Sequence, residues 1–81
     1  MRVNVLLFAR LKEIAGATRL EREVAGPATI GSVWNALARD YPELGGYTSS
    51  VSAAINAEYA RMTAAVNDGD EIAFLPPVSG G

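Results

Sequence analysis

Residues 29–41 have the apolar spacing of an amphipathic helix, while most other segments of the chain alternate like strands. Apolar side chains recur three and four residues apart, at Ile30, Val33, Leu37 and Tyr41. Thr29 is a good N-cap residue, and Pro42 ends the segment because the residue before a proline avoids the α region. These signals predict a helix of about three turns. We expect Trp34, which flanks the stripe, and Tyr41 to take part in helix packing.

The strand-like segments are short and lie on both sides of this helix. We expect strands at residues 2–8, 18–24, 51–55, 59–62 and 71–75. Residues 9–15 predict a short helix that Gly16 ends, and residues 42–50 predict a loop. One main helix on a mixed sheet is an α+β two-layer domain. The helix between two pairs of strands favours the β-grasp, or ubiquitin-like, arrangement.

The composition excludes several classes of chemistry. The 81 residues include no cysteine and no histidine, so the chain offers no disulfide, no thiolate nucleophile and no imidazole base. Seven basic and nine acidic residues give a net charge of −2, which opposes a nucleic-acid partner. No apolar run approaches the roughly 18 residues that a membrane span needs. We therefore expect a cytoplasmic protein that binds neither nucleic acid nor membrane.

Two smaller features have ordinary structural interpretations. Asp68, Asp70 and Glu71 resemble a cation site, but an Asn-Asp-Gly-Asp run before a strand more often forms a turn. We therefore predict no metal site. Lys12, the single lysine, is a candidate acceptor or pairing residue, although a solvated lysine is the commoner case.

The end of the chain, Pro76-Pro77-Val78-Ser79-Gly80-Gly81, is the candidate reactive group. Consecutive prolines favour a stiff polyproline II course, in which six residues reach about 19 Å. Gly80 and Gly81 lack a Cβ, so they can enter a narrow channel. We therefore expect a domain at residues 1–75 and an extended tail at residues 76–81. Terminal glycines are often functionless, and the prolines alone could serve only to block strand pairing.

An α-carboxylate at Gly81 becomes reactive only after activation, most simply as an acyl-adenylate. Sulfide would then give a thiocarboxylate, and an amine would give an amide. A terminal thiocarboxylate needs no cysteine, which agrees with the composition.

The sequence resembles the MoaD-type small subunit of molybdopterin synthase, in the MoaD/ThiS sulfur-carrier family. The resemblance covers essentially the whole chain. It is carried by VNVLLFARLKEIAG at residues 3–16, AAIN at residues 53–56 and, most specifically, DGDEIAFLPPVSGG at residues 68–81. The thiamin sulfur carrier shares the fold and the Gly-Gly end but usually lacks the proline-rich exit.

The resemblance implies a β-grasp protein that carries sulfur in molybdenum cofactor biosynthesis. Gly81 would be adenylated by an E1-like enzyme with ATP and Mg²⁺, converted to a thiocarboxylate, and used to donate sulfur to cyclic pyranopterin monophosphate. The implied partners are the large synthase subunit, in a heterotetramer of two small and two large subunits, the E1-like enzyme and a sulfur donor protein. No cofactor would be bound stably, and the chain would be non-catalytic alone.

The alternating pattern also predicts which surface meets the partner. In a β-grasp fold the first and last strands are neighbours, so Leu6, Phe8 and Leu75 would form an apolar patch beside the tail, joined by Tyr59. Pro76, Pro77 and Val78 would complete the partner-binding segment. Each of these residues taken singly is more often part of the core or of an ordinary surface.

Other functions remain open at this stage. A ubiquitin-like modifier would use the same activated Gly81 to form an isopeptide with a lysine. Sulfur carriers for thiamin or tRNA thiolation would use the same Gly-Gly end. A plain interaction module with an inert tail is the third class.

Overall fold

Ten elements make up the computed structural model, which describes residues 1–77 of the chain. The strands are β1 (Arg2–Leu7), β2 (Arg19–Glu23), β3 (Ala28–Thr29), β4 (Ser52–Ile55), β5 (Glu58–Ala60), β6 (Ala65–Val66) and β7 (Glu71–Leu75). The helices are α1 (Ala9–Ala15), α2 (Ile30–Asp40) and the 3₁₀ helix η1 (Pro42–Tyr47). Five of the strands and both α-helices correspond to predicted elements.

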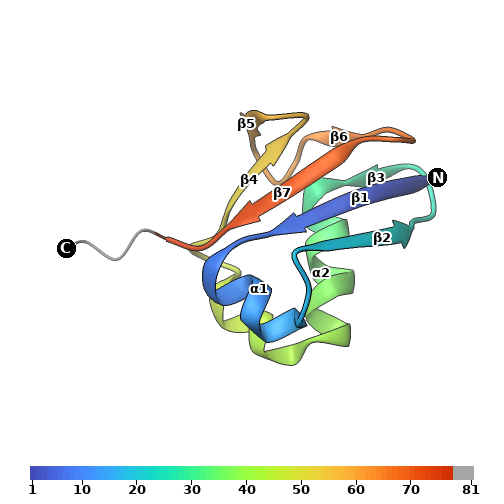
Figure 1. Cartoon of the computed structure of the whole chain (residues 1–81). Helices are drawn as coiled ribbons and strands as arrows, with labels where there is room; N and C mark the ends of the chain where they lie inside the picture. The colour runs from blue at the N-terminus through green and yellow to red at the C-terminus, as the bar shows by residue number, and fades with distance from the viewer. Residues whose placement is uncertain (78–81) are drawn as a thin grey trace.

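Five strands form one mixed sheet in the order β2-β1-β7-β4-β5, and β3 pairs with β6 separately. β1 and β7 are parallel neighbours, while the other pairs of the large sheet are antiparallel. Figure 1 shows α2 lying against one face of this sheet. The predicted α+β class, the β-grasp arrangement and the edge position of β2 are confirmed.

The two faces of the sheet differ in burial. Alternate side chains of the central strands are fully buried, namely Val3, Val5, Leu7, Ile72 and Phe74. They belong to the same core as the buried residues of α2, which are Ile30, Val33, Trp34 and Leu37. We call the side of the sheet that packs on α2 the inner face and the opposite side the outer face. The inner face contains the core.

Trp34 is the largest residue of this core and is only 1% exposed. The centroid of the Trp34 ring lies 4.9 Å from the ring centroid of Phe74 on β7, and the two ring planes make an angle of 56°. Its indole Nε1 donates a hydrogen bond of 2.9 Å to the Thr48 hydroxyl, which follows η1. Trp34 therefore joins α2, the central strand and the segment after the helix, and its predicted packing role is confirmed.

The start of α2 is fixed by the predicted N-cap. The Thr29 hydroxyl accepts a hydrogen bond of 3.1 Å from the Ser32 amide, and the Ser32 hydroxyl accepts one of 2.9 Å from the Thr29 amide. This reciprocal capping box satisfies two amides that the first turn leaves free. At the other end, the Arg22 guanidinium pairs with Asp40 and lies 6.0 Å from the centre of the Tyr41 ring. Both ends of α2 are therefore held by specific polar contacts.

Several sequence predictions were wrong in detail. The first strand ends at Leu7, so Phe8 is outside it. The predicted loop at residues 42–50 begins with η1, which buries Leu44. The short ladder of β3 with β6 was not predicted, because two-residue strands leave too little periodicity to detect. The return strand expected at residues 59–62 is β5, displaced by one residue at its start and two at its end.

The hairpin between β4 and β5 turns through two residues with positive φ. Asn56 has φ 48° and Ala57 has φ 72°. Two left-handed residues in a two-residue loop are typical of a type I′ turn, which favours Asn followed by Gly. Asn56 suits this conformation, but the Cβ of Ala57 is strained in it.

We predict that Ala57→Gly stabilises the protein by about 1 kcal/mol, because glycine adopts the left-handed region without a steric penalty. Chemical denaturation measures the change in unfolding free energy. Ala65→Gly in β6 is the control, and it should lower stability by about 0.5–1 kcal/mol because that position is a strand. Equal destabilisation by both variants would contradict the strain argument.

Candidate partner-docking surface

The outer face is apolar where β1 and β7 end. Leu6 of β1 lies opposite Ala73 of β7 in the parallel ladder, and Leu75 follows Ala73 on the same face. Both leucines are half-buried, whereas the intervening Leu7 and Phe74 are fully buried on the inner face. The structure therefore places Leu6 and Leu75 on the predicted side of the sheet.

Phe8 joins this surface although it lies outside the strand. Its backbone remains extended at φ −123° and ψ 153°, so the alternation continues and its side chain stays on the side of Leu6. The residue is 41% exposed. The next residue, Ala9, has φ 52°, and the Leu11 amide donates to the Phe8 carbonyl at 3.1 Å. This tight turn into α1 leaves Phe8 exposed between the buried Leu7 and Leu11.

Tyr59 occupies the far side of the same face. It lies on the edge strand β5 opposite Ala54 of β4, and Ala54 lies opposite Ala73. The residue is 81% exposed. Phe8 and Tyr59 are the exposed large hydrophobic residues within residues 1–77. We refer to Leu6, Phe8, Tyr59 and Leu75 as the apolar patch.

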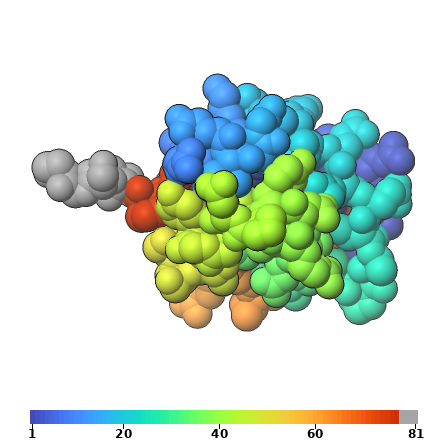
Figure 2. Space-filling model, turned by 90° about the horizontal axis from the view of Figure 1, so that it is seen from below, coloured from blue at the N-terminus to red at the C-terminus, as the bar shows by residue number. Residues whose placement is uncertain are grey.

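The tail begins at the apolar patch. β7 ends at Leu75, and Pro76 and Pro77 follow without regular secondary structure, the first half-buried and the second exposed. Figure 2, seen from below, shows this end of the described chain emerging beside α1 and η1. The predicted site residues Val78, Gly80 and Gly81 lie outside the described residues. The division into residues 1–75 and 76–81 stays a prediction.

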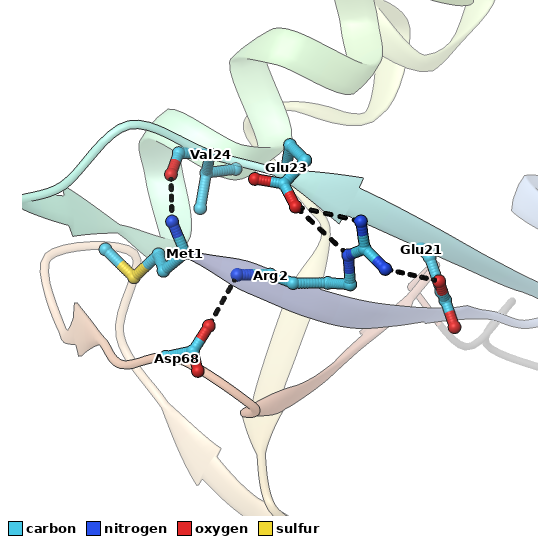
Figure 3. Close-up of polar contacts among 6 residues, drawn as sticks. All are labelled: Met1, Arg2, Glu21, Glu23, Val24 and Asp68. Atoms are coloured by element: carbon cyan, nitrogen blue, oxygen red, sulfur yellow. Dashed lines mark hydrogen bonds and ion pairs between the residues drawn. The ribbon is translucent and has the colours of Figure 1, made fainter.

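The other half of the outer face is charged. Figure 3 shows Arg2 between two carboxylates of β2, with Glu23 at 3.0 Å and Glu21 at 3.7 Å. Closer to the patch, Arg19 of β2 pairs with Glu71 of β7 at 2.9 Å. These pairs are exposed, so each adds little to stability. They make the boundary of the apolar patch polar.

The turn at residues 67–70 uses its carboxylates internally. The Asp70 carboxylate accepts hydrogen bonds from the Asn67 amide at 2.7 Å and from Asn56 Nδ2 at 3.0 Å. The Asp68 carboxylate accepts one of 2.7 Å from the Arg2 amide, also drawn in Figure 3. The positive φ of 86° at Gly69 completes the turn. The predicted turn is confirmed, and it ties the start of β7 to β1 and to the hairpin.

Residues 1–77 contain no group of three or more side chains that could hold a metal ion. No pocket opens on this described part of the chain. No helix in it is long and apolar enough to cross a membrane.

Lys12 is exposed on α1. The pKa of Arg10 is raised above its ordinary value by a hydrogen bond to Glu13; desolvation opposes this rise, and the negative charges of Glu43 and Glu13 add to it. Arg10 therefore stays protonated.

Comparison with known proteins decides the family. The ThiS family model matches residues 5–81. The chain belongs to the ThiS family. A curated relative from Mycobacterium tuberculosis, named molybdopterin synthase sulfur carrier subunit, is 37% identical over 100% of this chain and 99% of its own length. The resemblance predicted from the sequence motifs is therefore confirmed.

Another similar protein carries a different name. Small archaeal modifier protein 1 of Haloferax volcanii is 37% identical over 93% of this chain and 95% of its own length. A crystal structure of that protein matches this one with a TM-score of 0.85, 33% identity and full coverage of both chains. The chain is thus similar in sequence both to a protein named as a sulfur carrier and to one named as a modifier, and it shares its fold with the modifier.

We predict that Asp70→Ala lowers stability by about 1–2 kcal/mol, because two donors lose a charged acceptor. Thermal unfolding with and without CaCl₂ or MgCl₂ measures this, and the parent protein should unfold at the same temperature in each case. A metal-dependent rise in the parent that Asp70→Ala abolishes would contradict the turn interpretation.

Proposed function

We propose that this protein is the sulfur carrier subunit of molybdopterin synthase. The observation that carries the proposal is the apolar patch at the end of β1 and β7, from which Pro76 and Pro77 leave the sheet. A carrier needs a docking surface beside its tail, so that a partner that binds one receives the other. The full-length similarity to the mycobacterial sulfur carrier subunit supports the same function.

The proposed chemistry takes place at the carboxylate of Gly81. In an E1-like enzyme this carboxylate attacks the α-phosphate of ATP, and pyrophosphate leaves with Mg²⁺. Sulfide from a donor protein then attacks the acyl carbon, AMP leaves, and a thiocarboxylate remains. In the large subunit the thiocarboxylate sulfur bonds to a carbon of cyclic pyranopterin monophosphate as an oxygen substituent of that carbon leaves. Water then cleaves the resulting thioester at its acyl carbon, which leaves the sulfur on the substrate and regenerates the Gly81 carboxylate. The chain has no histidine or cysteine, so acid–base groups come from its partners.

The proposed partners follow from this sequence of steps. The E1-like enzyme, the sulfur donor and the large subunit must each reach the tail. Because Gly80 lacks a Cβ, this part of the tail can enter a narrow channel in a partner. The large subunit and the activating enzyme would use the apolar patch in turn. A complex of two small and two large subunits and a cytoplasmic location are parts of the proposal.

A second candidate function is protein modification. The similarity to small archaeal modifier protein 1, in sequence and in fold, favours it specifically. In this case the activated Gly81 would form an isopeptide with a target lysine and release AMP. The same apolar patch and tail serve both functions, so the product at Gly81 distinguishes them.

The intact mass of the protein isolated from its native cells tests the proposal. We predict an oxygen-to-sulfur exchange at Gly81, lost when the E1-like gene is deleted. Adding one residue after Gly81 should abolish molybdopterin synthesis, because the activated carboxylate is displaced. High-mass conjugates without the sulfur form would support the modifier. Unmodified chain under all conditions, or molybdopterin made by a chain lacking Gly81, would refute sulfur transfer.

We predict that Leu75→Ala and Phe8→Ala each weaken binding to the large subunit by about tenfold, as expected for a central apolar contact. Isothermal titration calorimetry measures the affinity, and circular dichroism checks the fold. Met62→Ala is the control, because Met62 is half-buried beside the start of α2, where its carbonyl accepts from the Gly31 amide. Unchanged affinity in both patch variants would refute docking at this surface.

A further inference from the structure

We propose that Lys12 is the position at which two copies of this chain are joined, by an isopeptide between its side-chain amine and the activated Gly81 of a second copy. The inference rests on the proposed function, because it uses the same acyl-adenylate at Gly81. It goes beyond that function by naming the acceptor residue and by restricting joined copies to a single kind of linkage.

Nucleophilic side chains are scarce in this sequence. It contains no cysteine, and its seven basic residues are one lysine and six arginines, whose guanidinium groups stay protonated and do not attack a carbonyl carbon. The hydroxyls of serine, threonine and tyrosine need a neighbouring base, and the chain has no histidine to supply one. Two amines remain as acceptors, the side chain of Lys12 and the α-amine of Met1.

The fold already uses the α-amine of Met1. The Met1 ammonium donates a hydrogen bond of 2.9 Å to the Val24 carbonyl, which Figure 3 draws, and the Met1 carbonyl accepts one of 2.8 Å from the Val24 amide. Met1 therefore extends the ladder between β1 and β2 by one residue, and it is half-buried against the core. To attack an acyl carbon, this amine must give up its hydrogen bond and the first residue must leave the ladder.

Lys12 has the opposite environment. It is exposed on α1, and its carbonyl accepts a hydrogen bond of 2.8 Å from the Gly16 amide, which fixes its backbone. The adjacent Glu13 pairs with Arg10 at 3.2 Å, and Arg10 also pairs with Glu43 at 3.3 Å. Within residues 1–77 the Lys12 amine forms no ion pair. Acylation of Lys12 therefore breaks no ion pair of the described chain.

The tail favours a second copy over the same chain as the donor. Figure 1 shows α1 at the end of the sheet where β7 ends, so Lys12 and the base of the tail belong to the same end of the molecule. Pro76 and Pro77 favour an extended course away from the sheet. An internal bond from Gly81 to Lys12 would need the tail to reverse its direction, whereas a bond between two copies does not.

The joining step needs only ATP, Mg²⁺ and the E1-like enzyme as co-reactants. The neutral Lys12 amine attacks the acyl carbon of the Gly81 adenylate, the bond from that carbon to the phosphate oxygen breaks, and AMP leaves. The lysine ammonium passes two protons to solvent as it becomes an amide nitrogen. Sulfide and the Lys12 amine thus compete for one acyl carbon, so we expect joined chains when sulfide is scarce.

The test incubates the full chain with the E1-like enzyme of the same organism, ATP and MgCl₂, without a sulfur donor. We expect joined chains in which each added copy contributes its own mass less one water. Trypsin should release residues 11–19, uncut at Lys12 and carrying residues 62–81, because the nearest cleavage sites are Arg10, Arg19 and Arg61. A linkage at Met1, or a single chain lighter by one water, would overturn the proposal.

Two variants test the acceptor. Lys12→Arg keeps the positive charge and Lys12→Gln removes it, and both should lose the joined chains. Arg39→Gln is the matched control, because it removes a cation from an exposed position of α2 and should leave joining unchanged. Joined chains that persist in Lys12→Arg, or an equal loss in Arg39→Gln, would contradict the assignment.

Two further measurements separate this inference from the proposed function. Pyrophosphate release reports adenylation of Gly81 and should be equal in the parent and in Lys12→Arg. Normal release without joined chains overturns only the inference, whereas no release from the parent overturns both. Excess sulfide should replace joined chains by the thiocarboxylate form, and an unchanged yield of joined chains would refute a shared acyl intermediate.

Discussion

The packing of Trp34 against Phe74 is the contact on which the rest of the structure depends. It fixes the only three-turn helix of the described chain on the strand at the centre of the sheet. A domain of 81 residues buries a modest core, so a single large aromatic pair accounts for much of it. The hydrogen bond from Trp34 to Thr48 extends the contact to the segment after η1. Helix, central strand and connection are thereby held in one arrangement.

This arrangement gives the two faces of the sheet different roles. The inner face takes the fully buried residues of β1 and β7, while the outer face is free to be charged at one end and apolar at the other. Because β1 and β7 are parallel, both strands end at the same end of the sheet, and their last apolar side chains lie there. The tail starts at this end with Pro76. The stability of the domain therefore depends on one face, and its proposed docking on the other.

Much of this was predictable because the relevant signals are local. Thr29 and Pro42 bracket α2, and the alternation of Val3, Val5 and Leu7 assigns them to one face. The small sheet of β3 with β6 was missed because its pairing joins segments more than thirty residues apart. The end of β1 was misplaced because the turn at Ala9 needs a backbone conformation that alanine rarely adopts. Long-range pairing and strained turns leave little trace in periodicity.

The sequence by itself determined the class of fold, the helix and the alternation of the strands, because each depends on the order of neighbouring residues. The chemistry proposed for the tail rests on the sequence in the same way. The family resemblance followed from motifs of the same kind. Only the tertiary structure decided which residues share a row across the sheet, since the ladders between β1, β7, β4 and β5 fix that register. Ala54 and Ala73 are ordinary residues in the sequence and become neighbours only when their strands pair.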